Sequence, residues 1–423
     1  MNRQTTNHIT TINTQKFKST TVKVSFKTHL TRENITPRIM LANVMRNATK
    51  VYGSKKILST HLEQLYGASL SVSAKKQGRM HVISFYMHVA NEKFLKSAPP
   101  LFEEAVKMLN EVIMNPKIEA GAFDTDVVNL EKRLLKEDIE SVYDDKTNYA
   151  LKEMIKVMCA DELFGVNGDG YIEDLTDISE TSLVKTYESM LKDDVVEIVV
   201  LGDVVHEDVV KRLSDAFSFE TGMRQPFSPV DTEEKELVAV VVKKEEQLVN
   251  QTKLNMGYRT YTRTGDEDYF ALLVFNGVFG GFAHSKLFVN VREKESLCYY
   301  CASHIDNFKG LMYVYSGLDL AQVDKAITII DAQLVDVANG VVSDDELMMA
   351  KKSIINGKRE SLDSTSGMLA DVAMSALLGL TADEFIARIE QVTKEDVAEV
   401  AKKIKKDTIF TLEPCATNEE VTA

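Results

Sequence analysis

The sequence contains the same succession of predicted elements twice. In each half, an apolar helix, a strand, a turn with glycine and a second strand are followed by a long helix, a break and another helix. Each half then closes with a helix and a strand. The matching segments are 58–87 with 284–318, 123–159 with 343–378, and 195–203 with 408–414. Three matches in one order predict two duplicated domains.

Helices and strands are both well marked. In 320–337 apolar residues recur every three or four positions, which predicts one buried helical face. Ser343 with Glu346, and Thr381 with Glu384, have the spacing of a capping box at a helix start. The strands mix β-branched and aromatic residues with partial alternation, as antiparallel strands with one face on helices do. Each domain is therefore expected to be α+β, a mostly antiparallel sheet backed by helices.

The junction between the two copies is visible in the composition. Residues 218–236 lose hydrophobic periodicity and carry Gly222, Pro226 and Pro229, as linkers do. We therefore predict an N-terminal domain at 1–222, a linker at 223–235 and a C-terminal domain at 236–415.

Charge and composition exclude some classes of function. A formal net charge of −14 argues against a nucleic-acid binder, which needs a basic face to neutralise phosphates. No run approaches the roughly 18 apolar residues of a membrane helix, and the first 21 residues lack the apolar core of a signal peptide. Four cysteines in 423 residues do not make a disulfide scaffold. We expect a cytoplasmic protein that binds neither nucleic acid nor membrane.

The segment 279–300 carries the most specific pattern. A glycine pair leads into an amphipathic helix that ends in Arg-Glu-Lys-x-x-Leu-x-Tyr. This pattern resembles the second half of the pitrilysin/insulinase family of zinc peptidases. The resemblance implies a duplicated fold of the LuxS/mitochondrial-processing-peptidase-like metallohydrolase type. It also implies that Arg292 and Tyr299, seven residues apart, reach a peptide substrate held at a zinc site.

The zinc motif of that family, His-x-x-Glu-His, is absent. Two imidazoles one helical turn apart are needed to reach one metal, but none of the eight histidines lies three or four residues from another. Alignment with the family's first helix places Met40, Asn43 and Val44 where the two histidines and the glutamate would stand. The third ligand would fall near Asp138, which we interpret as a solvated helix charge. We predict no metal in this chain.

The resemblance is closest to bacterial metal-free proteins associated with elongation factor P modification, which resemble partners of a zinc-bearing subunit. It implies that this chain supplies Arg292 and Tyr299, in trans, to a homologous subunit that holds zinc. It also implies that the two subunits enclose unfolded peptides between them. The alternative is a non-catalytic structural or assembly protein of the same fold. A third reading, a self-sufficient zinc enzyme with unusual ligands, would require stoichiometric metal.

Simpler explanations exist for the same residues. A cation near a helix C-terminus, such as Arg292, is favoured by the helix dipole, and a strand tyrosine usually packs. Gly280-Gly281 is better explained by a tight strand-to-helix turn than by a phosphate loop. Cys298 and Cys301 have CxxC spacing, but residues three apart in a regular strand face opposite sides. We therefore expect no bridge or shared metal between these thiols.

Overall fold

The computed structural model describes residues 2–6, 8–96, 99–217 and 227–415. Their internal contacts divide them into two compact units. Unit 1 contains the residues up to 141 and those from 166 to 227, and unit 2 contains residues 142–165 and those from 228 onward. Both units combine a sheet with helices, which confirms the α+β class. Positions 222–226 of the predicted boundary and linker lie outside the described residues.

Unit 1 is built on a six-stranded sheet with the order β1-β2-β8-β3-β5-β4. Every neighbouring pair is antiparallel except β2 and β8, which run parallel. The strands are β1 (Asn2–Thr6), β2 (Ile9–Asn13), β3 (Ser19–His29), β4 (Ser69–Gln77), β5 (Met80–Ala90) and β8 (Val195–Gly202). A separate pair is formed by β6 (Ile118–Glu119) and β7 (Ala122–Phe123).

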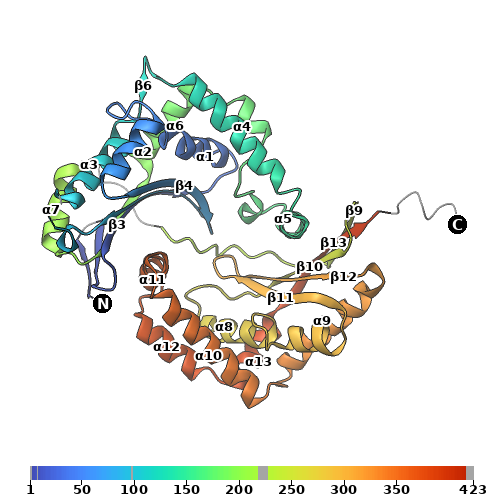
Figure 1. Ribbon diagram of the computed structural model, residues 1–423. Helices are drawn as coiled ribbons and strands as arrows, with labels where there is room; N and C mark the ends of the chain where they lie inside the picture. The colour runs from blue at the N-terminus through green and yellow to red at the C-terminus, as the bar shows by residue number, and fades with distance from the viewer. Residues whose placement is uncertain (1, 7, 97–98, 218–226, 416–423) are drawn as a thin grey trace. The chain divides into compact units, whose positions relative to one another are not determined.

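Helices cover one face of this sheet, as the apolar alternation of its strands requires (Figure 1). They are α1 (Ile35–Met45), α2 (Lys55–Gln64), α3 (Leu101–Met114), α4 (Thr125–Ser141), α6 (Glu180–Asp193) and α7 (His206–Ala216), with short turns η1 (Glu92–Phe94) and η3 (Glu173–Thr176). Phe26 and Phe85, from the paired strands β3 and β5, meet edge to face at the centre of the core.

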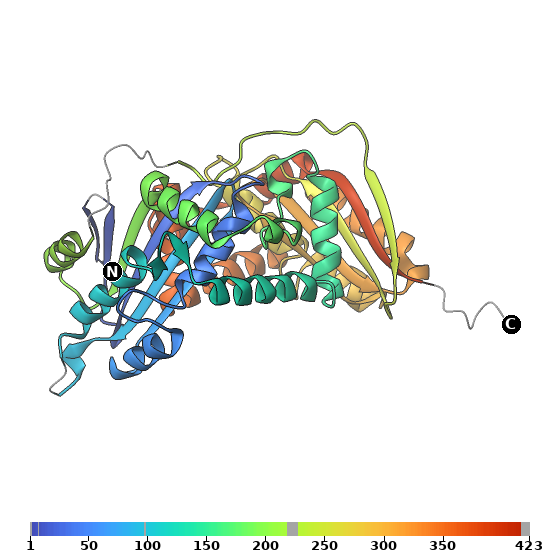
Figure 2. The ribbon, with the colours of Figure 1, turned by 90° about the horizontal axis from the view of Figure 1, so that it is seen from above.

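Unit 2 repeats this strand order. Its five strands run β9-β13-β10-β12-β11, and only β9 and β13 are parallel. In this order they correspond to β2-β8-β3-β5-β4 of unit 1, so the duplication inferred from the sequence is confirmed strand by strand. Figure 2 shows β13 beside β9 at the edge of the sheet. The strands are β9 (Val241–Gln247), β10 (Thr252–Arg259), β11 (Cys298–Asp306), β12 (Leu311–Leu318) and β13 (Lys405–Pro414).

The main core of unit 2 lies between this sheet and a helical layer (Figure 1). The layer contains α8 (Tyr269–Phe279), the π-helical segment η4 (Phe288–Lys294), the turn η5 (Leu320–Gln322), α9 (Val323–Ala338), α10 (Asp344–Ser361), α11 (Thr365–Leu378), α12 (Ala382–Gln391) and α13 (Lys394–Lys403). The two predicted capping boxes start α10 and α12. Among the described ranges, every helix is too short or too polar to cross a bilayer.

The second face of the unit 2 sheet is covered by α5 (Lys146–Met158), a helix from the first half of the sequence. Its residues Ala150, Met154 and Met158 pack against apolar residues of β12 and β13. Gly257 of β10 makes this approach possible, because a Cβ there would lie only 2.5 Å from the sulfur of Met158 and 2.7 Å from that of Met154. The central strands β10, β12 and β13 of the unit 2 sheet are therefore covered on both faces.

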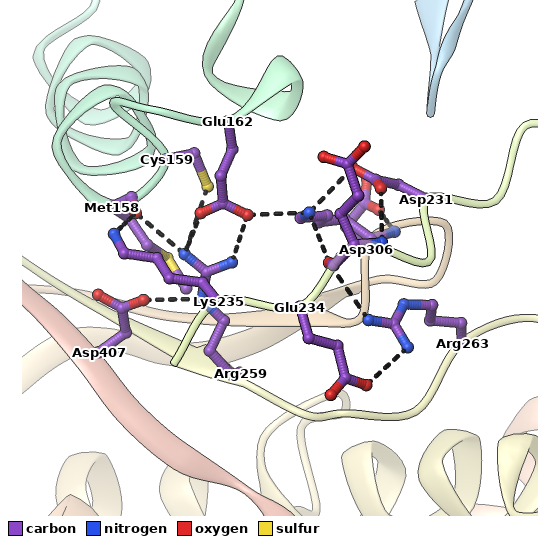
Figure 3. Close-up of polar contacts among 12 residues, drawn as sticks. Met158, Cys159, Glu162, Asp231, Glu234, Lys235, Arg259, Arg263, Asp306 and Asp407 are labelled. Atoms are coloured by element: carbon purple, nitrogen blue, oxygen red, sulfur yellow. Dashed lines mark hydrogen bonds and ion pairs between the residues drawn. The ribbon is translucent and has the colours of Figure 1, made fainter. Parts of the chain in front are cut away.

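A buried ionic network fixes the C-terminal end of α5, which leads into the turn η2 (Leu163–Gly165) (Figure 3). The Arg259 guanidinium donates to both carboxylate oxygens of Glu162, at 2.6 and 2.9 Å, and to Asp407 of β13 at 2.7 Å. It also donates to the carbonyl oxygen of Met158 at 3.0 Å, one of the acceptors that a helix end leaves free. Lys309 joins Glu162 at 2.8 Å and Asp231 at 2.9 Å.

This network matters energetically because its charges are almost fully removed from water. Only 4% of the Arg259 side chain and 1% of that of Lys309 are exposed. Burial alone would raise the pKa of Glu162, but hydrogen bonds from Arg259 and Lys309 outweigh it and hold that pKa below its ordinary value. Removing one partner would leave a buried charge without compensation, which costs far more than the pair itself contributes.

We predict that Arg259→Met lowers the free energy of unfolding of unit 2 by about 3–5 kcal/mol, because Glu162 and Asp407 lose their shared cation. Urea unfolding should show the loss, and hydrogen exchange should accelerate in residues 146–158. Because the folded pKa of Glu162 is lowered, its contribution is complete above the ordinary carboxyl value of 4.5 and is lost as the pH falls through the folded pKa.

The matched control is Arg212→Met on α7, where a half-exposed arginine pairs with Asp208 one turn away. Such a surface pair contributes less than about 1 kcal/mol. Equal effects of the two substitutions, or unchanged exchange in residues 146–158, would contradict the role given to Arg259.

Candidate functional site

Arg292 lies near the end of η4, the π-helical segment between α8 and β11. Leu287 and Val291 are fully buried in the core of unit 2 and fix this segment to the sheet. Arg292 itself is exposed, and its guanidinium carbon stands 4.4 Å from the centroid of the Phe288 ring. At an exposed site such a cation–π contact stabilises by about 0.5–1 kcal/mol, enough to orient the side chain and leave its donors free.

The segment η4 and the residue that follows it are both held by α9. Asn290 donates to Gln333 of α9 at 2.5 Å, and Glu295 pairs with Lys325 at 2.7 Å. After η4 the chain turns sharply at Ser296, whose φ of 52° is left-handed. Strand β11 therefore begins only four residues after the end of η4.

The glycine pair before η4 allows close packing and is not a phosphate loop. Gly280 follows the last residue of α8, and its carbonyl accepts a hydrogen bond from the Ser303 amide of β11 at 2.9 Å. A Cβ on Gly280 would stand 2.5 Å from the Ser303 hydroxyl oxygen. The predicted tight turn is present, but it connects two helical segments. The prediction of a strand before it is wrong, because the apolar run 269–279 is a buried helix.

Tyr299 is displayed by a β-bulge. In the pairing of β11 with β12, Cys298 faces Leu318 and Tyr300 faces Gly317, so Tyr299 has no partner in the register. An extra residue in one strand bends it locally and re-aims its side chain. The side chain of Tyr299 is 77% exposed as a result.

Arg292 and Tyr299 are thus both presented to solvent from adjoining elements of unit 2. Neither side chain makes a hydrogen bond or ion pair within the described ranges of the chain. Arg292 offers donors in a fixed planar fork that suits a carbonyl or carboxylate, and Tyr299 offers one phenolic donor. The pair is suited to binding an anionic or carbonyl oxygen.

The same bulge brings Cys298 and Cys301 to one face of β11. The expectation that these residues face opposite sides is wrong, because the extra residue at Tyr299 shifts the alternation by one. Both belong to the core between the sheet and the helices, Cys301 as a buried member and Cys298 as a half-buried one. A hydrogen bond from Cys301 lowers the pKa of the Cys298 thiol to about 7, with further contributions from Ser316 and Arg292.

The positions aligned with the family's zinc motif do not fit a metal. Met40 is fully buried, Val44 is nearly so, and neither side chain is a zinc ligand. Asp138, aligned near the third ligand, is exposed on α4. Among the described residues there is no group of three or more His, Cys, Asp or Glu side chains that could hold a metal ion.

Glu131, seven residues before Asp138 on α4, is a buried carboxylate that its place in the sequence does not reveal. Only 1% of its side chain is exposed, and it accepts hydrogen bonds from Arg46 and Asn47, which directly follow α1, at 3.0 Å each. It therefore ties α4 to the end of α1 and is fully occupied by these partners. A glutamate at a regular helical spacing gives no signal in the sequence that separates it from its exposed neighbours.

His81 is fully buried on the face of β5 that the helices cover. Burial lowers its pKa to about 3, with a smaller contribution from the nearby Arg38, so its ring is neutral at pH 7. Arg38 pairs with Asp194 at 2.7 Å and donates to the carbonyl oxygen of His81. His88, seven residues on, lies on the opposite face and contacts Thr21. The two imidazoles therefore do not converge on one metal.

We predict that the purified chain retains less than stoichiometric zinc after incubation with an equimolar amount and gel filtration, because no set of imidazole, thiolate or carboxylate ligands converges among the residues that the structure describes. Elemental analysis measures this directly. A zinc peptidase with a known metal site, treated in parallel, serves as the positive control. One zinc per chain would contradict the assignment.

We also predict that Cys298 reacts with iodoacetamide half-maximally near pH 7, since the thiolate is the nucleophile and its pKa is lowered to about 7. Cys159 should stay unmodified over the same range, because burial raises its pKa to about 12. Mass spectrometry of the alkylated peptides gives both rates. A midpoint for Cys298 at or above pH 9 would contradict the hydrogen-bonded thiol pair.

Known proteins share this architecture and, in part, this sequence. A family model described as "Peptidase M16 inactive domain" matches residues 177–354. The chain is 37% identical over 403 residues to the probable inactive metalloprotease YmfF of Bacillus subtilis. The alignment covers 95% of this chain and 94% of that protein. A crystal structure of a conserved protein from Enterococcus faecalis V583 matches with a TM-score of 0.88 and 35% identity, over 97% of each chain.

A crystal structure of a peptidase M16 inactive domain from Pseudomonas fluorescens matches with a TM-score of 0.79 over 99% of each chain. Its identity of 16% shows a common fold. The relationship to YmfF, by contrast, extends over nearly the full length of both chains at an identity that establishes common family membership. The chain therefore belongs to the M16 peptidase family.

Proposed function

We propose that this chain is the non-zinc subunit of a heterodimeric M16 metallopeptidase, to which it contributes Arg292 and Tyr299. The proposed partner is a homologous subunit that carries zinc, and the proposed substrate is an unfolded peptide in the cytoplasm. The closer likeness to proteins associated with elongation factor P modification stays a prediction.

One observation carries the proposal. Arg292 and Tyr299 are both exposed and directed by dedicated local structure, a π-helical segment for the first and a β-bulge for the second. A tyrosine whose role was packing would be buried. An arginine whose role was to interact with the helix dipole would not need a local structure that exposes its guanidinium. The metal side of an M16 site, in contrast, is replaced in this chain by side chains such as Met40 and Val44.

The chemistry of the pair fits a supporting role in peptide hydrolysis. The guanidinium of Arg292 stays charged at any working pH and can hold a substrate carbonyl through two parallel donors. The phenol of Tyr299 can donate to the oxygen that becomes negative in the tetrahedral intermediate. The partner subunit would supply the metal and the general base.

The second candidate is a non-catalytic structural or assembly protein. The observation in its favour is that the described residues contain no metal-holding group and that a relative as similar as YmfF is named as probably inactive. This candidate predicts stable association with a partner but no contribution of Arg292 or Tyr299 to cleavage.

We predict that Arg292→Ala and Tyr299→Phe each lower kcat/KM of the assembled heterodimer about a hundredfold or more, since each removes a donor to the developing oxyanion or its carbonyl, worth roughly 3 kcal/mol. The assay mixes the purified chain with its zinc-bearing partner and follows cleavage of an unfolded peptide. The neighbouring open reading frame, if it encodes His-x-x-Glu-His in a chain of similar length, identifies that partner.

Two substitutions serve as matched controls. Lys294→Ala removes an exposed cation from η4, where Lys294 donates a hydrogen bond to Asn290. Tyr66→Phe removes the hydroxyl group of an exposed tyrosine in unit 1. Both should leave cleavage within about twofold, because surface changes of this kind cost no more than roughly 0.5 kcal/mol. Undiminished cleavage by both Arg292→Ala and Tyr299→Phe, with intact association, would favour the assembly protein.

A further inference from the structure

The two thiols beside the bulge form a pair that the proposed function does not use. Cys298 opens β11 and is half-buried, whereas only 2% of Cys301 is exposed. Both side chains turn to the same face of β11, towards the core between the sheet and the helices, and Cys301 faces Ser316 on the neighbouring strand. One thiol of the pair is thus partly exposed to solvent, and the other is buried on the same face.

The strand register sets the span between these residues. Cys298 faces Leu318 and Cys301 faces Ser316, so the two cysteines are separated by two steps of β12. Two antiparallel steps cover about 6.8 Å between Cα atoms. Disulfides bridge Cα atoms roughly 4.4–6.8 Å apart, so the pair lies at the long end of this range. A bond would draw the two Cα atoms together and push Tyr299 further out of the strand.

We propose that Cys298 and Cys301 are a redox modification site, which a peroxide oxidises to an intramolecular disulfide and a low-molecular-weight thiol reduces again. A disulfide formed at the limit of the permitted span is strained and therefore easily reduced. This property suits a compartment that keeps thiols reduced, where disulfides are transient and regulatory.

The atoms balance in two steps. The Cys298 thiolate attacks one oxygen of hydrogen peroxide, the O–O bond breaks, and Cys298 becomes a sulfenic acid while the other oxygen leaves as hydroxide. The sulfur of Cys301 then attacks the sulfenic sulfur, the S–S bond forms, and the leaving hydroxyl takes the Cys301 proton away as water. Overall, two thiols and one peroxide give one disulfide and two waters. Cys298 is the attacking residue because it is the more exposed thiol and the better thiolate.

The bond would act on the candidate site because Tyr299 lies inside the loop that it closes. Cys298 stands between the two residues of the candidate site in the chain, six residues after Arg292 and directly before Tyr299. We therefore infer that oxidation displaces Tyr299 and lowers peptide cleavage, and this consequence rests on the proposed function above. The formation of the disulfide itself does not.

The first experiment tests only the bond. The reduced full-length chain is treated with hydrogen peroxide, its remaining thiols are alkylated, and the peptide that contains both cysteines is weighed by mass spectrometry. We expect that peptide to lose two hydrogen atoms and to regain them with dithiothreitol. Two alkylated thiols after treatment, or a sulfinic acid on Cys298 beside a free Cys301, would overturn the proposal.

Matched variants separate the pair from the other thiols. Cys159→Ser should form the disulfide as the parent does, since the buried Cys159 takes no part. Cys301→Ser should stop at the sulfenic acid of Cys298, which a dimedone probe labels, and Cys301→Ala should do the same if serine disturbs folding. Labelling of Cys301 in Cys298→Ser at the rate of Cys298 in the parent would contradict the order of the steps.

The second experiment adds the zinc-bearing partner. Oxidation should lower cleavage toward the level of Tyr299→Phe, dithiothreitol should restore it, and the double variant Cys298→Ser/Cys301→Ser should be insensitive to peroxide. A disulfide that forms without any change in cleavage overturns the regulatory inference. If Arg292→Ala and Tyr299→Phe have no effect on cleavage, the proposed function fails, while the mass measurement still decides whether the disulfide exists.

Discussion

The charge contacts around Arg259 hold together parts of the chain that are far apart in the sequence. A single guanidinium joins the end of α5, the strand that carries it and the final strand β13. The pairing is stable because each guanidinium nitrogen has a partner. A buried charge without a partner would cost more free energy than the pair contributes. The apolar contacts of Met154 and Met158 seal the same region from water. Without this anchor the second face of the unit 2 sheet would be open.

Much of the architecture could be predicted from the sequence, because duplication leaves two copies of each local pattern. The helix starts at Ser343 and Thr381 followed from capping boxes, since these signals are local and chemically specific. The placement of α5 could not be predicted. An amphipathic pattern shows which face of a helix is apolar but not which sheet receives that face, and Gly257 gains its meaning only when the methionines lie over it.

The candidate site was predictable to a similar degree. The family pattern pointed to Arg292 and Tyr299, and the structure displays both, although their function stays a proposal. The bulge at Tyr299 was not predictable, because a strict two-residue period is the default for any strand and one extra residue leaves no trace in composition. That single residue decides whether Cys298 and Cys301 lie on opposite faces or side by side. It links the display of the tyrosine to the pairing of the thiols.

The position of α5 also has a consequence for how the chain is made on the ribosome. The apolar side of this helix, which includes Ala150 and Met154, leaves the exit tunnel long before its docking surface on β12 and β13 exists. At ordinary rates of synthesis the delay of about 250 residues lasts roughly 10 to 50 s. During that time the nascent helix must stay shielded, so the growing polypeptide presents a natural target for chaperones until its last strand emerges.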